Sequence, residues 1–282
     1  MAQAFALGCL RAPQHRKAGL DMAGQRQMEQ HNPLRLAGLS ALVTGGSRGI
    51  GRAIAQALTQ AGCEVTIMGR DAASLDEAVG HGVAAHALCG DVTDLQALAS
   101  LMAGRSVDIL VNNAGTAISA PFAQQDPAAF AAMTAQHLSA PAELARLLLP
   151  AMLAKGFGRI INIGSTASVQ GYQGVAAYVA AKHAILGLTR ALALEVAKKG
   201  VTVNAVCPGF TATDLILDSM ADTARKTGQT AEEVLAKFVS KKPLGRLVEP
   251  AEVAFAVVML ADPQASAING QGLIVDGGES IA

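Results

Sequence analysis

The chain has 282 residues, of which 51% are hydrophobic and 16% are charged. Such an apolar chain can bury a large core, which excludes a disordered or fibrous protein. Lys plus Arg equal Asp plus Glu, 22 against 22, and aromatic residues make up only 3%. Balanced charge and scarce aromatic side chains argue against a nucleic-acid partner. Such a protein usually has an excess of basic side chains that contact phosphates and aromatic side chains that stack on bases.

The sequence predicts a cytoplasmic protein without a membrane span. Residues 160–181 carry no charge, but Asn, Ser, Thr, Gln and Gly interrupt them throughout, unlike a membrane helix. The four cysteines, Cys9, Cys63, Cys89 and Cys207, form no CxxC pair. Because a chain of this length needs no disulfides, we expect reduced thiols.

Residues 1–38 differ from the rest of the chain, with five basic residues against two acidic ones. They contain little Ser, no sustained amphipathic period and no apolar stretch of the signal-peptide type,. We expect a poorly structured extension at 1–38 and one domain at 39–282. Met22 and Met28 are candidates for alternative translation starts.

From Leu39 onward, short apolar runs alternate with longer segments of helical periodicity. The predicted strands are residues 40–44, 64–68, 107–111, 159–163, 201–206 and 273–275. Apolar residues three and four positions apart predict helices between them. This alternation predicts a single α/β domain with a parallel sheet, and the continuous apolar strands fit burial beneath helices on both faces.

The first predicted strand runs into a glycine-rich turn, Thr44-Gly45-Gly46-Ser47-Arg48-Gly49-Ile50-Gly51, which is followed by a predicted helix. Glycine permits a positive φ and a close approach of the backbone to a ligand, and free amides at a helix start favour an anion. Between a first strand and a first helix, such a turn predicts a dinucleotide site that holds the pyrophosphate.

The second predicted strand leads to Gly69 and Arg70, where dinucleotide sites place the group that meets the adenosine ribose. No acid stands at the strand end to bond the 2′-hydroxyl, and Arg48 in the glycine turn supplies a second guanidinium for a 2′-phosphate. NADP(H) is therefore favoured over NAD(H). Asp71 keeps NAD(H) open, and solvated surface arginines are the alternative interpretation.

Tyr178 and Lys182 stand four residues apart in a helical pattern, so their side chains share one helix face. Ser165 follows the predicted strand 159–163, at the edge of a parallel sheet where ligands bind,. A hydroxyl, a phenol and an ammonium are therefore expected to meet beside the nicotinamide.

These three groups suit hydride addition to a ketone, which leaves negative charge on oxygen and needs a nearby proton donor. A phenol with a pKa of about 10 is a slow acid near neutrality. An ammonium about 4 Å away is expected to lower that pKa by about three units before desolvation. We expect Tyr178 as general acid, Lys182 as the charge that depresses its pKa, and Ser165 as hydrogen-bond donor to the carbonyl.

Taken together, these motifs resemble the short-chain dehydrogenase/reductase family from Leu39 to the end of the chain. The matching elements are residues 44–51, Asp91-Val92, Asn112-Asn113-Ala114-Gly115, Ser165, Tyr178 with Lys182, Pro208-Gly209 with Thr213, and Pro243-Leu244-Gly245-Arg246. The resemblance implies a doubly wound, seven-stranded Rossmann sheet with helices on both faces, and binding of the nicotinamide ribose by Lys182.

The resemblance also implies a set of cofactor-binding residues. It places Asp91 and Val92 around the adenine, Asn113 to Gly115 beside the cofactor, and Thr213 on the nicotinamide carboxamide. The full cofactor-binding set is Thr44, Gly45, Ser47, Arg48, Gly49, Ile50, Gly51, Arg70, Asp91, Val92, Asn113, Ala114, Gly115, Tyr178, Lys182, Pro208, Gly209 and Thr213.

One position departs from the family's pattern. The family has an Asn before Leu in the helix after Asn-Asn-Ala-Gly, and its backbone carbonyl holds a water of the proton relay; here His137 stands before Leu138. The backbone carbonyl survives this change, and an imidazole that titrates near neutrality can assist the relay. A helix histidine without a catalytic part is the alternative. The other histidines have no metal-binding spacing.

Residues 214–242 are expected to form a helix-rich insertion that covers the substrate. Lys241 and Lys242 are candidates for a substrate phosphate, with solvated lysines as the alternative. The predicted helix at residues 187–194, together with residues 203–210, looks most like those of β-ketoacyl-thioester and polyketide ketoreductases. We therefore expect an NADPH-dependent reductase of a small carbonyl compound, most specifically a 3-oxoacyl thioester of acyl carrier protein or CoA.

Two rival functions remain open at this point. One is an NAD(H)-dependent secondary-alcohol, steroid or diol dehydrogenase, and the other is a cofactor-binding partner subunit with little turnover. The resemblance also implies a homotetramer, or a homodimer, with the predicted helices around residues 140–149 and 187–197 as candidate interfaces.

Overall fold

The computed structural model describes residues 36–281. The predicted extension therefore lies outside the described residues up to Arg35, together with Cys9, Met22 and Met28. Its last residues belong to the fold, because Leu36 is 1% exposed and packs in the same core as Val43 and Val65.

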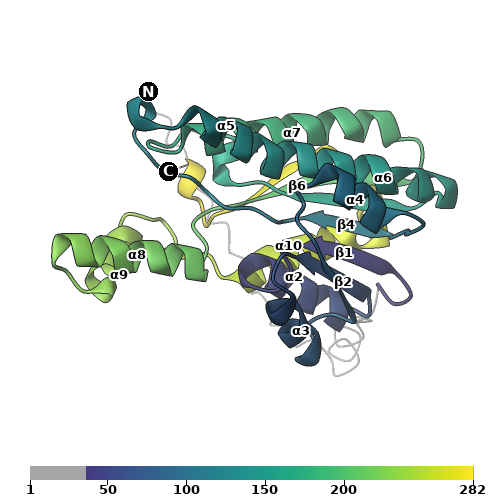
Figure 1. Ribbon diagram of the computed structural model, residues 1–282, viewed down its shortest axis with the longest axis horizontal. Coiled ribbons are helices and arrows are strands. Elements are labelled where there is room, and N and C mark those ends of the chain that lie inside the picture. The colour runs from purple at the N-terminus through teal and green to yellow at the C-terminus, as the bar shows by residue number, and fades with distance from the viewer. Residues whose placement is uncertain (1–35, 282) are drawn as a thin grey trace, which may run out of the picture. The chain divides into compact units, whose positions relative to one another are not determined.

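Seven parallel strands form one sheet, in the order β3-β2-β1-β4-β5-β6-β7 (Figure 1). Their bounds are β1 Ser40–Thr44, β2 Glu64–Gly69, β3 His86–Cys89, β4 Ile109–Asn112, β5 Gly158–Ile163, β6 Val201–Pro208 and β7 Gly272–Val275. The six strands predicted from apolar runs are all present, and the short edge strand β3 completes the seven that the family resemblance implies. The predicted doubly wound parallel sheet is confirmed.

Helices cover both faces of this sheet (Figure 1). One face carries α2 (Gly49–Gln60), α3 (Ala72–Gly80) and α10 (Pro250–Ala261); the other carries α4 (Leu95–Met102), α6 (Ala140–Lys155) and α7 (Ala176–Val196), with α5 (Pro127–Thr134) packed on α7. Side chains alternate along each strand. Val43 accordingly packs in the cluster of α2 and α10, and Leu42 in that of α6 and α7.

Shorter elements shape the loops between these helices and strands. They are the 3-10 helices Phe122–Gln124, Thr166–Ser168, Pro263–Ala267 and Glu279–Ile281, and the π-helical turn Ala135–Ser139 between α5 and α6. Two further helices, α8 (Asp214–Thr227) and α9 (Ala231–Val239), lie beside the layered sheet (Figure 1) and form the helix-rich segment expected at 214–242.

Because all strands run in parallel, their carboxyl ends share one edge of the sheet. At that edge β1 enters the glycine turn, β4 the Asn113 loop, β5 the Ser165 loop and β6 the Gly209 turn. Among residues 36–281, no helix has the length and apolar character that crossing a membrane demands.

Candidate active site

The glycine turn after β1 forms a tight cradle that side chains would fill. Gly45 and Gly49 have φ angles of +66° and +53°, which favour glycine,. A Cβ at Gly51 would lie 2.1 Å from the carbonyl oxygen of Gly45, which nothing but glycine permits. Arg48 precedes α2 without a side-chain cap, so the first amides of α2 remain available to an anion such as a pyrophosphate.

The loop after β4 is hydrogen-bonded directly to this cradle. Asn113 donates from Nδ2 to the Thr44 carbonyl at 2.9 Å and to the Gly45 carbonyl at 3.2 Å. The backbone amides of Asn113 and Ala114 both donate to Oγ1 of Thr44, at 2.9 and 3.0 Å. The structure thus joins these two predicted cofactor-binding segments.

Thr213 lies on the other side of the turn. Its Cγ2 would be 3.4 Å from a Cβ at Gly49. Gly209, directly after β6, is confined as well, because a Cβ there would lie 2.8 Å from Cβ of Asp276. Ser47 and Ile50 of the turn are half-buried, and Val92 is buried after β3.

At the adenosine end, two arginines stand beside carboxylates. Arg70 lies 3.7 Å from Asp91 through Nη1 and Oδ2, and Arg48 is exposed. Asp71 caps α3 by accepting from the amides of Ala73 and Ser74. Hydrogen bonds from Ser74, strengthened by the charge of Arg48, keep the pKa of Asp71 below its usual value. Asp71, the residue that kept NAD(H) as an alternative cofactor, is thus engaged in capping α3.

Ser165, Tyr178 and Lys182 come from the end of β5 and the start of α7. Oγ of Ser165 accepts a hydrogen bond from the amide of Ala167 at 3.1 Å, which orients it at the start of its 3-10 turn. Lys182 donates from Nζ to the Ile163 carbonyl at 2.7 Å, and Nζ lies 5.6 Å from the centre of the Tyr178 ring.

The electrostatics of this trio differ from the sequence expectation. Burial raises the pKa of Tyr178, and a hydrogen bond with Ser165 opposes that rise. Lys182 is 5% exposed, and burial lowers its own pKa to about 8. The pKa of Tyr178 is therefore raised rather than lowered as expected, because desolvation is the largest influence on the phenol,. The Lys182 ammonium is instead bonded to the Ile163 carbonyl.

His137 lies in the π-helical turn against the same tyrosine. Nε2 bonds the Thr116 carbonyl at 2.7 Å, so Nε2 must carry the proton,. The imidazole meets the Tyr178 ring edge to face, with 5.3 Å between centres and 88° between planes. Burial, helped by the charge of Lys182, lowers the pKa of His137 to about 3. The expectation of an imidazole that titrates near neutrality is wrong.

A row of aromatic side chains borders the site. The hydroxyl of Tyr172 shares a 2.7 Å hydrogen bond with Oγ1 of Thr166. Its ring meets Phe210 at 6.0 Å between centres, and Phe210 meets Phe238 of α9 at 4.8 Å. Sequence spacing has no signal for this contact between three distant segments.

Lys242 packs against the last two of these aromatic rings. Its Nζ lies 4.4 Å from the centre of the Phe210 ring and 4.6 Å from that of Phe238, and it pairs with Glu279. Neither side chain of the pair is more than 16% exposed. Lys242 is thus engaged in an internal ion pair, so the alternative of a solvated lysine is wrong for this residue. Lys241 is exposed, and a phosphate contact of either lysine stays a prediction.

Comparisons with known proteins agree with this geometry. A family model described as "Enoyl-(Acyl carrier protein) reductase" matches residues 45–280. The 3-oxoacyl-[acyl-carrier-protein] reductase FabG of Vibrio harveyi is 37% identical over 255 residues, which cover 87% of this chain and 98% of that protein. The D-beta-hydroxybutyrate dehydrogenase of Cupriavidus necator is 37% identical over 254 residues, 86% of this chain and 98% of the relative.

Among solved structures, a variant of actinorhodin polyketide ketoreductase with NADPH superposes with a TM-score of 0.81 and 35% identity, over 86% of this chain and 98% of that one. The chain belongs to the short-chain dehydrogenase/reductase family. It is an oxidoreductase that acts on an alcohol or ketone, in a family that binds NAD(P).

Proposed function

We propose that the protein reduces a ketone with NADPH and that its substrate is a 3-oxoacyl thioester of acyl carrier protein or CoA. The observation that supports this most is the contact of Tyr178 with both Ser165 and Lys182 at the sheet edge that also holds the glycine cradle. The names of two relatives, FabG and the acetoacetyl-CoA reductase of Rhizobium meliloti, favour this substrate class.

In this mechanism the bound nicotinamide supplies the hydride that the carbonyl carbon accepts. Ser165 donates a hydrogen bond to the carbonyl oxygen and so orients it. Tyr178 donates its hydroxyl proton to the same oxygen as negative charge develops there. The resulting alcohol carries that proton, and the phenolate recovers one from solvent.

Lys182 has two proposed tasks. Its ammonium, held at the end of β5 by the Ile163 carbonyl, stabilises the phenolate that forms on Tyr178, because a cation helps most where negative charge appears in the transition state. With cofactor present, it also binds the nicotinamide ribose.

NADPH is the proposed cofactor because Arg48 and Arg70 flank the adenosine end while Asp71 is engaged in capping α3. The alternative is an NAD(H)-dependent dehydrogenase of a secondary alcohol. One observation favours this alternative: Asp91 lies 3.7 Å from Arg70 and so competes with a 2′-phosphate for that guanidinium.

Residues 214–242 are proposed to cover the substrate. The aromatic chain of Tyr172, Phe210 and Phe238 reaches from the residue after Ser165 to α9. An apolar wall of this kind suits an acyl chain better than a polyhydroxylated sugar, since an unpaired hydroxyl there would lose its hydrogen bonds to water.

Binding and turnover separate the candidate functions. The protein has no Trp, so the fluorescence of the reduced nucleotide itself should be titrated, with NADPH and then NADH. Oxidation of NADPH on acetoacetyl-CoA should exceed that on simple ketones. Faster reduction of NAD⁺ with 3-hydroxybutyrate would favour the dehydrogenase, and nucleotide binding without turnover on any carbonyl or alcohol would favour the partner subunit.

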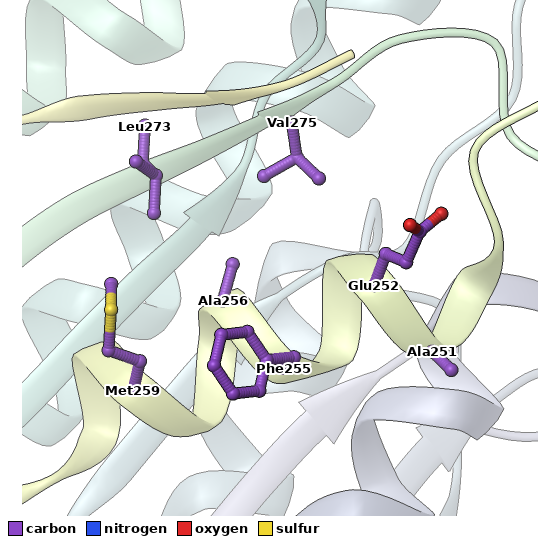
Figure 2. Close-up of a pocket in the computed structure, with 7 residues that line it drawn as sticks. All are labelled: Ala251, Glu252, Phe255, Ala256, Met259, Leu273 and Val275. Atoms are coloured by element: carbon purple, nitrogen blue, oxygen red, sulfur yellow. The ribbon is translucent and has the colours of Figure 1, made fainter. Parts of the chain in front are cut away.

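A homotetramer in the cytoplasm completes the proposal. α6 and α7 remain the candidate interfaces, and Leu194 on α7 is 83% exposed. An apolar groove of about 570 Å³ lies between α10 and the edge strand β7 and is a further candidate interface. Figure 2 shows Leu273 and Val275 of the strand above Ala256 and Met259 of the helix. Light scattering should give the mass of four chains, and a monomer would refute the assembly.

A further inference from the structure

The π-helical turn between α5 and α6 holds the cofactor-side loop through two consecutive side chains. Oε1 of Gln136 accepts from the amide and from Oγ1 of Thr116, at 3.0 and 3.1 Å. Nε2 of His137 donates to the carbonyl of the same residue at 2.7 Å. Thr116 directly follows Gly115. The hydrogen bonds from Gln136 and His137 therefore hold the end of the loop after β4, whose Asn113 bonds the glycine cradle.

The imidazole of His137 also fills the space between this loop and the candidate acid. A Cβ at Gly115 would lie 2.2 Å from Cε1 of His137, so the ring packs flush against the glycine. The ring meets Tyr178 edge to face at 5.3 Å between centres, and His137 is 4% exposed. One side chain therefore contacts both the cofactor-side loop and the tyrosine ring.

The surroundings of the imidazole disfavour a charged form. Facing it are the Lys182 ammonium and the Tyr178 phenol, both from α7, and the Thr116 carbonyl from the loop. The ammonium repels a second positive charge, and burial penalises any charge. Nε2 already carries a proton that is committed to Thr116, so the ring has no proton to pass toward Tyr178 in this geometry.

We propose, on the basis of the function proposed above, that His137 is a positioning residue: a neutral ring that ties the cofactor-side loop to the ring of Tyr178 and takes no part in proton transfer. Its two contacts are separable. The hydrogen bond to Thr116 holds the loop and hence the cofactor, whereas the flat ring desolvates Tyr178 and holds it in place.

Two substitutions remove one contact each. His137→Phe keeps a flat ring against Tyr178 but cannot donate to Thr116, and His137→Asn keeps a donor group but removes the ring. Exposed His183 on α7, replaced in the same two ways, is the matched control. Thermal unfolding of each variant checks that the fold is retained.

The tyrosine content of the chain makes the readout direct. The chain has two Tyr and no Trp, so in a Tyr172→Phe background the phenolate absorbance reports Tyr178 alone. The two-tyrosine protein, titrated in parallel, serves if that background folds poorly. We expect His137→Asn to lower the apparent pKa of Tyr178 by about one unit as water reaches the phenol, and His137→Phe to leave it within a few tenths.

Nucleotide titration gives the complementary result. We expect His137→Phe to weaken NADPH binding about tenfold, as the loss of one buried hydrogen bond would, and the His183 variants to change neither quantity. If both His137 variants moved the phenol pKa equally, or neither weakened NADPH, the proposal would be overturned.

A third measurement addresses proton transfer itself. Proton NMR of the His137 ring should show no titration between about pH 5 and 8, whereas a midpoint in that range would support a relay and contradict the proposal. None of these measurements needs a substrate. Absence of ketone turnover in the unsubstituted protein would therefore refute the proposed function while leaving the positioning of Tyr178 to be judged separately.

Discussion

Nζ of Lys182 donates to the carbonyl oxygen of Ile163 at 2.7 Å, so the buried ammonium is bonded to the strand that leads to Ser165. The carbonyl supplies a partner for the charge but does not abolish the cost of burial. As a result the pKa of Lys182 falls to about 8. The side chain therefore loses its charge under mildly alkaline conditions.

A pH dependence follows from this value. Below about pH 8 Lys182 is charged, and above it the ammonium loses its proton, while the raised pKa of Tyr178 keeps the phenol protonated. Ketone reduction should therefore decline above about pH 8, up to tenfold per pH unit. Initial rates at saturating NADPH test this, and a rate that stayed constant to about pH 10 would contradict it.

Removal of the phenolic hydroxyl should abolish acid catalysis without affecting cofactor affinity. For Tyr178→Phe we expect NADPH to bind within about threefold of the unsubstituted protein and kcat to fall at least about 100-fold, the usual effect of a lost general acid. Tyr172→Phe is the matched control, because it also removes a phenolic hydroxyl, one that bonds Oγ1 of Thr166. A Tyr178→Phe rate within tenfold would exclude Tyr178 as the acid.

Cofactor preference should depend on Arg70. Arg70→Ala removes a charge-assisted contact with the 2′-phosphate, so NADPH affinity should fall about 10- to 100-fold and NADH affinity by less than about threefold. Arg146→Ala, an exposed arginine paired with Glu143 on α6, controls for net charge. Equal losses for both nucleotides would show that Arg70 does not read the phosphate.

Acid sensitivity should be traceable to His137. Its pKa is about 3 in the folded protein against an ordinary value of 6.5, so the folded state binds fewer protons. The unfolding free energy therefore falls as pH drops from about 6.5 toward about 3, by up to about 1.4 kcal/mol per unit. Urea unfolding at several pH values should show a shallower decline for His137→Phe; parallel curves would refute this.

The ion pair of Lys242 and Glu279 should matter for the segment at 214–242. Lys242→Met leaves a largely buried carboxylate without its partner, which destabilises by about 3 kcal/mol. Glu279→Gln in addition should recover most of that loss. We also expect KM for the carbonyl substrate to rise in Lys242→Met while NADPH affinity stays unchanged, and a change confined to NADPH would contradict a link to the substrate.

Local patterns predicted most of the fold. Runs rich in apolar residues such as 159–163 became fully buried strands, because both faces of the sheet are covered by helices,. The two polar residues of this run, Arg159 and Asn162, are buried with hydrogen bonds to their neighbours,. The strand that apolar runs did not indicate, β3, has four residues and lies at the sheet edge with exposed His86 and Cys89. Its existence depends on pairing with β2, which no local signal contains.

In the candidate site too, the positions of the residues could be predicted from the sequence, but their protonation could not. Motif order predicted that Thr44, Asn113 and Ser165 share one edge of the sheet, because each lies at or just after the carboxyl end of a parallel strand. The protonation behaviour of Tyr178, Lys182 and His137 could not be predicted from spacing, since it depends on how deeply each group is buried and on partners such as Ile163 and Thr116.

The aromatic contacts of Tyr172, Phe210 and Phe238 link the serine loop to α9. Because each ring contacts its neighbour, a substitution that changes the size or shape of one ring requires the neighbouring ring to move. Laboratory evolution toward a new substrate should therefore recover compensating changes at two or three of these positions in the same clones, and libraries that vary only one of them should yield few improved enzymes.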